Sequence, residues 1–432
     1  MTRVHLMGIG GSGVSALARV FLARRAVVSG CDVRESHTTL QLAAEGARIE
    51  IGHDPAHVQG QDLLIYIGTI HSRSEEVHAA RANGVRVVTR AQMLSQLVAE
   101  NDSIVVAGTH GKTTVTYMAG HVLVAAGFDP TVLVGDGSSS RAGCSRWLVA
   151  EGDESDGSLA LHRPQHGILT SVEFDHPDHF ANLDQVDRAF RDFLAVVPGV
   201  AVVCADYHRA VAMPAGGRRV TYGRPKAADY RCVDAAGGRF LVERRGARLA
   251  EVRLMVPGAH NRVNASGALA LAVELGIEPR VAAEALSSFP GAHRRMERLG
   301  IWKGASVYDD YGHHPTKVRA TLAAARELDH RRLVLVFQPH RYTRYTALRD
   351  EFAISLREAD EVVVTEIYGA GEENPGGLSG AELAALVPGA RFAPDLGAAR
   401  EHLEALVSPG DLVLLMGAGD IRSLGDELAN AG

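Results

Sequence analysis

The sequence predicts an α/β protein made of three successive units, each a mostly parallel sheet covered by helices. Short apolar segments alternate with helix-like stretches along the chain. Polar residues gather directly after those segments, at the sheet edge where open α/β folds bind ligands. The chain has 432 residues, too many for one hydrophobic core. We expect the units to span 1–100, 101–292 and 293–432.

The first unit has the pattern of a parallel sheet with helices on both faces. Its apolar segments are short and bounded by polar or glycine residues, as in buried strands. We expect strands at 3–7, 26–32, 47–52, 62–68 and 86–90. A helix is expected over 14–25, and another over 90–102 leads into the second unit at Asn101–Asp102.

The second and third units continue this alternation. In the second, a strand at 103–108 and strands within 146–158 and 166–179 precede an insert at Tyr230–Val256, where short alternating segments predict antiparallel pairing. A helix is expected over 260–276. The third unit begins near 289–297, with strands expected within 305–315, 332–341, 360–371 and 411–421.

The composition is that of an ordinary globular protein. It is 46% hydrophobic and 22% charged, with a formal net charge of -6 and no long basic run. Nucleic acids and anionic membranes are therefore not expected partners. The four cysteines are widely spaced, and no signal peptide or membrane span is predicted, so we expect a cytoplasmic protein.

A loop rich in glycine follows the strand at 103–108. It runs from Gly108 to Thr114, shorter than the common phosphate-binding pattern because Val106 stands where that pattern has its first glycine. Backbone N–H groups at a helix start favour phosphate, Lys112 can reach β- and γ-phosphates, and Thr113 can offer a hydroxyl to Mg²⁺. A chance match is the alternative, but the strand–loop–helix context favours nucleotide binding.

A second glycine loop, Gly8-x-Gly10-x-x-Gly13, lies near the N-terminus, and Asp32 ends the next predicted strand. This is the dinucleotide fingerprint, so an NAD enzyme is one interpretation. Such a loop binds a diphosphate, however, and a UDP-sugar suits it equally. Glycines that only allow close packing are the third possibility.

Clusters of polar residues follow strands of the second and third units. Acids and histidines of the second unit suit Mg²⁺ or Mn²⁺ beside phosphates, although most could be solvated loop residues. Zinc is disfavoured at His176 and His179, because no cysteine or third close histidine completes a site. Arginine forks of the third unit suit carboxylates and phosphates. The clusters comprise Glu151, Asp153, Glu154, Asp156, Glu173, Asp175, His176, Asp178 and His179, then Arg294, Arg295, Asp309, Asp310, Tyr311, His313, His314, His340, Arg341 and Arg344.

In order and spacing, these motifs resemble the Mur ligase family over essentially the whole chain. The resemblance implies a Rossmann-like N-terminal domain for a UDP-sugar, a P-loop ATP-binding central domain and a Rossmann-like C-terminal domain for an amino acid. The stretches that carry it are 5–18, 105–114, 150–158, 173–179, 258–265, 294–297, 309–316, 337–344 and 416–421. The N-terminal loop and 309–315 favour the member that joins L-alanine to UDP-N-acetylmuramate in peptidoglycan synthesis, a step of cell-wall biogenesis tied to cell shape and division.

The resemblance also implies roles for particular residues. The residues implied to bind the UDP-sugar are Gly10, Gly11, Ser12, Gly13 and Asp32. Those implied to bind metal are Thr113, Glu154 and His176. ATP binding falls to Gly108, Thr109, His110, Gly111, Lys112, Thr113, Thr114, His260, Asn261, Asn264, Arg295 and Asp310. The muramyl carboxylate and alanine fall to Tyr311, His313, His340, Arg341 and Arg344, and the catalytic set is Lys112, Glu154, His176, Arg295 and His313.

The implied reaction has two steps. The carboxylate of UDP-N-acetylmuramate attacks the γ-phosphorus of ATP, with two metal ions present, and the alanine amine then attacks the acyl phosphate. His176 or His313 could take the amine proton. A sister ligase that adds a whole peptide, an NAD-linked oxidoreductase and a nucleotide-gated binding module are the competing interpretations.

The chain departs from the family pattern at two places. Gly68-Thr69-Ile70-His71 replaces a usual Ser-Ser-Ala run, and Gly135–Ser140 stands where paired glycines are usual. Several sister ligases use a carbamoylated lysine near the second metal, but 174–199 contains no lysine, so none is expected here.

Overall fold

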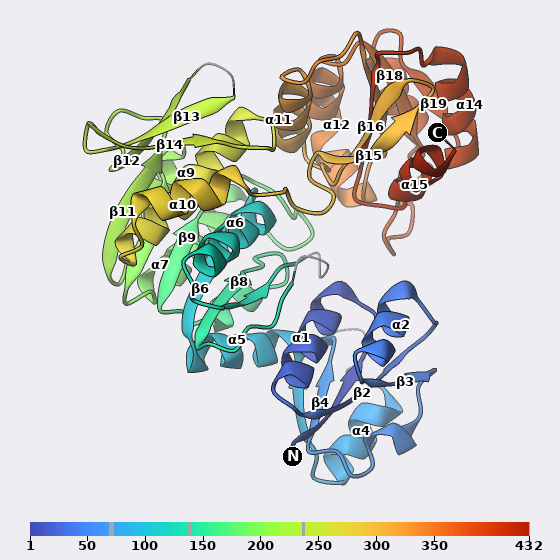
Figure 1. The fold of residues 1–432 in the computed structure, drawn as a ribbon. Coiled ribbons are helices and arrows are strands. Elements are labelled where there is room, and N and C mark those ends of the chain that lie inside the picture. The colour runs from blue at the N-terminus through green and yellow to red at the C-terminus, as the bar shows by residue number, and fades with distance from the viewer. Residues whose placement is uncertain (69–72, 136–139, 236–237, 432) are drawn as a thin grey trace.

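The computed structural model describes residues 1–68, 73–135, 140–235 and 238–431. The chain forms three α/β bodies in sequence order, with the middle one between the other two (Figure 1). Most of both departures noted above, residues 69–71 and 136–139, lies outside the described residues.

The first sheet is parallel and has the strand order β3-β2-β1-β4-β5. Each predicted strand is present, because its alternate residues pack under helices on one face or the other. The strands are β1 (Arg3–Met7), β2 (Val27–Asp32), β3 (Arg48–Ile51), β4 (Leu63–Tyr66) and β5 (Arg86–Thr89). The helices are α1 (Ser12–Ala23), α2 (His37–Ala44), the 3₁₀ helix η1 (Pro55–Val58), α4 (Glu75–Ala82) and α5 (Arg90–Glu100).

The helix expected over 14–25 begins two residues earlier, because Gly11 is its N-cap. The helix expected over 90–102 ends at Glu100, and β6 starts at Asp102. One connecting residue therefore joins the first body to the second.

The middle sheet has the order β14-β13-β12-β11-β10-β9-β6-β8-β7. Strands β12, β13 and β14 pair antiparallel within the insert predicted at Tyr230–Val256, which confirms it. The strands are β6 (Asp102–Ala107), β7 (Thr131–Leu133), β8 (Trp147–Glu151), β9 (His166–Leu169), β10 (Val200–Cys204), β11 (Arg218–Gly223), β12 (Tyr230–Asp234), β13 (Arg239–Arg244) and β14 (Ala247–Arg253). The helices are α6 (Lys112–Ala125), η2 (Ser158–Leu161), α7 (Leu183–Ala195), α8 (His208–Val211), α9 (Ala259–Glu274) and α10 (Pro279–Ser287).

The third sheet has the order β15-β16-β20-β17-β18-β19, parallel except for the β15–β16 hairpin. Its strands are β15 (Glu297–Trp302), β16 (Ala305–Asp310), β17 (Leu333–Phe337), β18 (Glu361–Thr365), β19 (Arg391–Ala393) and β20 (Leu412–Met416). Its helices are α11 (Pro315–Ala325), α12 (Tyr342–Leu356), α13 (Gly380–Leu386), α14 (Leu396–Leu406) and α15 (Arg422–Asn430). None of the helices in the described part of the chain is both long and apolar enough to cross a membrane.

Candidate active site

The lysine loop connects β6 to the N-terminus of α6 in a conformation that requires glycine. Gly108 and Gly111 have φ values of 134° and 83°, in the left-handed region. A Cβ on Gly108 would lie 2.2 Å from the Thr170 hydroxyl oxygen, and one on Gly111 would lie 2.9 Å from Oδ1 of Asn264. The loop can therefore pass close to its neighbours and aim the first amides of α6 at one point, which suits an anion.

Lys112 lies at the centre of this arrangement. Its Nζ is 2.8 Å from Oε2 of Glu154 and donates to the Gly108 carbonyl at 2.7 Å. Burial acts to lower the pKa of Lys112, but the carboxylates of Glu154, Asp153 and Glu151 outweigh it and the pKa is raised. The ammonium group is thus held charged inside the protein.

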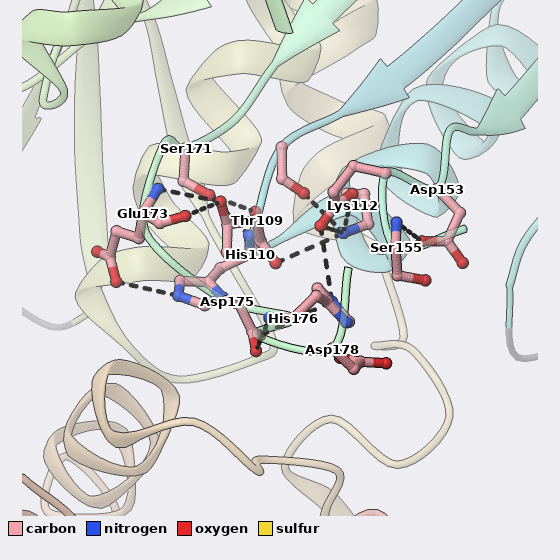
Figure 2. A network of polar contacts seen from close by, with 12 residues as sticks. Thr109, His110, Lys112, Asp153, Ser155, Ser171, Glu173, Asp175, His176 and Asp178 are labelled. Atoms are coloured by element: carbon pink, nitrogen blue, oxygen red, sulfur yellow. Dashed lines mark hydrogen bonds and ion pairs between the residues drawn. The ribbon is translucent and has the colours of Figure 1, made fainter. Parts of the chain in front are cut away.

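The predicted metal ligands divide into two neighbouring places. The Thr113 hydroxyl lies 3.0 Å from both carboxylate oxygens of Glu151. Glu154 instead pairs with Lys112, and its Oε1 lies 3.8 Å from Nε2 of His176. In Figure 2, Lys112 at the start of α6 and His176 on the loop after β9 lie near one another. Burial lowers the pKa of His176 to about 4, so its imidazole is neutral and able to ligate.

A carboxylate beside the lysine loop connects the middle and third domains. Glu173 accepts from His110 at 3.1 Å and from the Thr316 hydroxyl of α11 at 2.7 Å. Ring nitrogens of His110 and His314 and a Glu173 oxygen lie within 4.8 Å of one another, so this group could also hold a cation. Residues that follow a strand of the middle domain therefore contact the first turn of α11 in the third domain.

The arginines of the third domain reach the middle domain in two different environments. Arg344 donates to Asp175 at 2.9 Å, and both side chains are buried, with 3% and 1% exposed. Arg341 donates to Asp178 at 2.7 Å, but that pair is about one-third exposed. Arg295 lies 3.5 Å from the Thr113 hydroxyl. Its neighbour Arg294 pairs instead with buried Asp309.

Two predicted ATP contacts, Asn261 and Asp310, have hydrogen-bond partners within the protein, and a third, His260, is a buried ring. Asn261 donates to the Pro257 carbonyl at 2.7 Å. The Asp310 carboxylate accepts from the Met296 and Gly312 amides at 2.9 and 2.8 Å. Burial lowers the pKa of His260 to about 4, which leaves a neutral ring at the start of α9.

One cavity of about 1120 Å³ joins these groups. The residues to which the resemblance gives roles and which line it are Ser12, Thr109, His110, Gly111, Lys112, Thr113, Thr114, His176, His260, Asn261, Asn264, Arg295, Asp310, Tyr311, His313, His340, Arg341 and Arg344. Of the other candidates, Glu151, Asp153, Asp156, Asp178 and Arg294 line it as well. Gly108 and Glu154 are outside this lining but contact Lys112. Gly10, Gly11, Gly13 and Asp32 are also outside it.

Lys317 is a cavity residue that sequence reasoning missed. Lys317 is on the first turn of α11, and its Nζ lies 3.4 Å from Nε2 of His313, which precedes that helix. Burial is the main cause that lowers its pKa to about 7, and the cations Arg295, Lys112 and Arg344 act the same way. The four-residue spacing of His313 and Lys317 could have indicated that the two side chains lie together. It could not show which side of α11 faces the cavity.

The N-terminal glycine loop is supported by its neighbouring strand. The Gly10 amide donates to Asp32 at 2.8 Å, and the amides of Gly8 and Ile9 donate to the Cys31 carbonyl. A Cβ on Gly13 would lie 3.0 Å from Arg90, another residue that the sequence did not reveal. Asp32 thus holds the loop in shape, while Ser12 at the start of α1 reaches the cavity.

Three family models match successive parts of the chain. They are described as the Mur ligase family catalytic domain over 3–101, the Mur ligase middle domain over 148–272, and the Mur ligase glutamate ligase domain over 294–419. The chain belongs to the Mur ligase family. The resemblance inferred from the motifs and the α/β fold class are thereby confirmed.

Individual Mur ligases cover almost the full chain. A UDP-N-acetylmuramate–L-alanine ligase of Acidothermus cellulolyticus is 44% identical over 96% of this chain and 92% of its own length. One from Anaeromyxobacter dehalogenans is 42% identical over 99% and 97%. A crystal structure of a UDP-N-acetylmuramate–alanine ligase from Thermotoga maritima matches with a TM-score of 0.82 at 29% identity, covering 100% of this chain and 99% of that one. A murein peptide ligase from Psychrobacter arcticus matches with a TM-score of 0.74 at 26% identity, covering 100% and 98%.

Proposed function

We propose that this protein is an ATP-dependent ligase that joins L-alanine to the lactyl carboxylate of UDP-N-acetylmuramate, releasing ADP and phosphate. The observation that carries the proposal is the single cavity shared by the lysine loop, the acids of the middle domain and the arginines and histidines of the third. The names of relatives at 44% and 42% identity support this choice of substrates. We place the reaction in the cytoplasm, as a step of peptidoglycan precursor synthesis.

The lysine loop is the proposed site of the ATP phosphates. The amides at the start of α6, the ammonium of Lys112 and the guanidinium of Arg295 all face the cavity and can neutralise a triphosphate. His260 and Asn264 line the same cavity on α9, where the adenine is proposed to lie. In-line attack by a carboxylate needs this positive charge, because two anions must approach each other.

Acidic residues beside the phosphates fit a divalent cation. Thr113 with Glu151, and Glu154 with His176, offer oxygen and neutral imidazole ligands of the kind that Mg²⁺ and Mn²⁺ accept. We propose two ions held by these groups. Such ions supply charge neutralisation on the transferred phosphoryl group.

The third domain is proposed to hold the two carboxylates. Arg344 is fixed by buried Asp175, so its guanidinium is oriented before any substrate arrives. His340 and Tyr311 line the cavity beside it, and Arg341 lies at the more exposed side. Orientation of the acyl phosphate and the amine in one enclosed cavity accounts for much of the expected rate.

Lys317 is our candidate for the group that takes the alanine proton. His176 and His313 both have lowered pKa values, to about 4 for His176 and well below its ordinary value for His313, because both are buried. Such rings are weak bases. Lys317, with a pKa of about 7 and contact with His313, is partly neutral near neutral pH. A base with that pKa matches the operating pH far better.

The N-terminal loop is the proposed site of the UDP diphosphate. Ser12 and Lys112 line one cavity, which supports two separate phosphate sites with the muramyl carboxylate between them. An NAD-linked activity leaves the lysine loop without a role.

The test is phosphate release from ATP in the presence of UDP-N-acetylmuramate, with each candidate amino acid and a cell-wall peptide supplied in turn. We expect release to depend on L-alanine, and hydroxylamine without alanine to trap a hydroxamate. Release that depends on a peptide instead would assign the chain to the activity named for the Psychrobacter relative. Release with neither acceptor would contradict the proposal.

A further inference from the structure

A second cluster of ligand-type side chains lies in the first domain, apart from the active-site cavity. It consists of His5 on β1, Cys31 on β2, His57 on η1 and Glu76 on α4, and we call it the His5 cluster. One ligand atom from each of these residues lies within 4.8 Å of the others. They come from four elements brought together on one face of the first sheet, beneath η1 and α4.

The contacts within the His5 cluster converge on one buried carboxylate. Glu76 is 1% exposed, and its Oε1 accepts from Nδ1 of His57 at 2.9 Å and from the Cys31 thiol at 3.3 Å. Nδ1 of His53 lies 2.7 Å from the other Glu76 oxygen and 3.4 Å from the Cys31 sulfur. Sulfur, imidazole nitrogen and carboxylate oxygen therefore surround one small volume.

One ring nitrogen of His5 is not accounted for by hydrogen bonds within the cluster. The residue is completely buried, and its Nδ1 is 2.9 Å from the Ser29 hydroxyl. Its Nε2 has no hydrogen-bond partner among the described residues. A buried ring nitrogen without a partner is costly. The hydrogen bond to Ser29 fixes the orientation of the ring, as an outer hydrogen bond does for metal-bound histidines.

The donor set identifies the class of cation. One thiolate, two imidazoles and one carboxylate suit a borderline ion with tetrahedral preference, whereas Mg²⁺ and Ca²⁺ prefer oxygen ligands. The thiolate and carboxylate also balance the charge of a divalent ion. We propose that the first domain binds one Zn²⁺ ion through His5, Cys31, His57 and Glu76. This structural site would fasten η1 and α4 to β2.

The site lies behind the N-terminal glycine loop. The Cys31 carbonyl accepts from the Gly8 and Ile9 amides at 2.8 and 3.1 Å. Binding of zinc to the Cys31 side chain would restrain the same residue that anchors the loop. The inference does not depend on the proposed ligase activity, because its readouts are metal content and spectra.

The experiment uses the full-length protein, purified without a metal-affinity tag and washed with Mg²⁺. We expect about one equivalent of zinc per chain, and a thiolate-to-metal charge-transfer band after replacement by Co²⁺. That band reports a cysteine ligand, so oxygen-liganded cobalt in the active site does not produce it. Cys31→Ser should lose the band and most of the zinc, and zinc should no longer raise its melting temperature.

Matched variants separate the site from adventitious binding. Cys144→Ser removes an exposed cysteine, and His78→Gln removes an exposed histidine on α4 two residues from Glu76. Both should keep the band and the zinc. Should Cys31→Ser fail to fold, His57→Gln, at a partly exposed position, gives the same test. A cobalt spectrum without a thiolate band, or equal zinc in wild type and His57→Gln, would overturn the proposal.

Discussion

The loop at 8–13 and the loop at 108–114 both connect a parallel strand to a helix, yet their surroundings differ. In the first, the Gly10 amide donates to Asp32, so a carboxylate holds the turn. In the second, Lys112 lies among Glu154 and other acids, and Arg295 approaches from another domain. A loop that offers mainly backbone amides suits a diphosphate that is bound but takes no part in the reaction. A loop with side-chain cations and nearby acids suits a phosphoryl group that is transferred.

The two loops also differ in how their domains are joined. Buried Arg344–Asp175 and the Thr316–Glu173 hydrogen bond tie the third domain to the lysine loop's side of the cavity. The first domain contacts the middle one through a shared apolar core, and its ion pair Arg90–Asp156, at 3.8 Å, is more exposed. The side of the proposed ATP site is thus joined by buried charges and hydrogen bonds between two domains, and we expect changes there to have larger effects.

Lys112→Ala provides the strongest test of this division. We expect amide formation to fall by about 10³-fold or more, because a charge that stabilises the transferred phosphoryl group is lost. The affinity for UDP-N-acetylmuramate, measured by calorimetry, should change by less than about twofold, since Lys112 is not a proposed contact of that ligand. Joint loss of both functions would contradict two separate sites.

The same variant leaves Glu154 buried without its cation, which can destabilise the fold. The double variant Lys112→Ala/Glu154→Gln serves as its control. It should regain thermal stability relative to Lys112→Ala without regaining activity.

Lys317→Met tests whether Lys317 takes the proton of the alanine amine. Because the neutral amine is the active base, activity should rise with pH through about 7 in the wild type, the pKa of Lys317. The variant should lose that limb of the kcat/KM profile for alanine and about 10²-fold in rate. Hydroxamate formation without alanine should persist, and an unchanged profile would remove Lys317 from this role.

Asp32→Ala tests the first loop. Loss of the charged acceptor of the Gly10 amide should weaken UDP-sugar binding by about tenfold, the effect of one charge-assisted hydrogen bond. The KM for ATP should stay unchanged. Glu35→Ala, at a neighbouring exposed acid, is the matched control and should leave both constants unaltered.

Ser12→Ala should have the smallest effect. The side chain is exposed at the first turn of α1, and it offers a ligand one neutral hydrogen bond. We expect about a threefold rise in the KM for UDP-N-acetylmuramate. A loss of activity as large as that of Lys112→Ala would mean that the first loop takes part in the reaction. The proposed difference between the two loops would then be wrong.

Local sequence patterns were sufficient for most of the sheet strands. The strands at 3–7 and 102–107 are short, mostly apolar and followed by glycine, so their burial could be predicted. The start of α1 was misplaced because Gly11 rather than a polar residue caps it. The candidate site was predicted where a motif contained it, as with Lys112 and His176. Lys317 and Arg90 stand outside recognisable motifs and were missed.

The sequence by itself determined the succession of strands and helices, the two phosphate-type loops and the family, because periodicity and motif spacing are local properties of the chain. Only the tertiary structure decided that Arg344 fixes Asp175, that Lys317 faces His313 with a lowered pKa, and that His5 and Cys31 meet Glu76. These pairings depend on how helices and domains pack, and the depth of burial that follows sets both the pKa values and the partners of each charge.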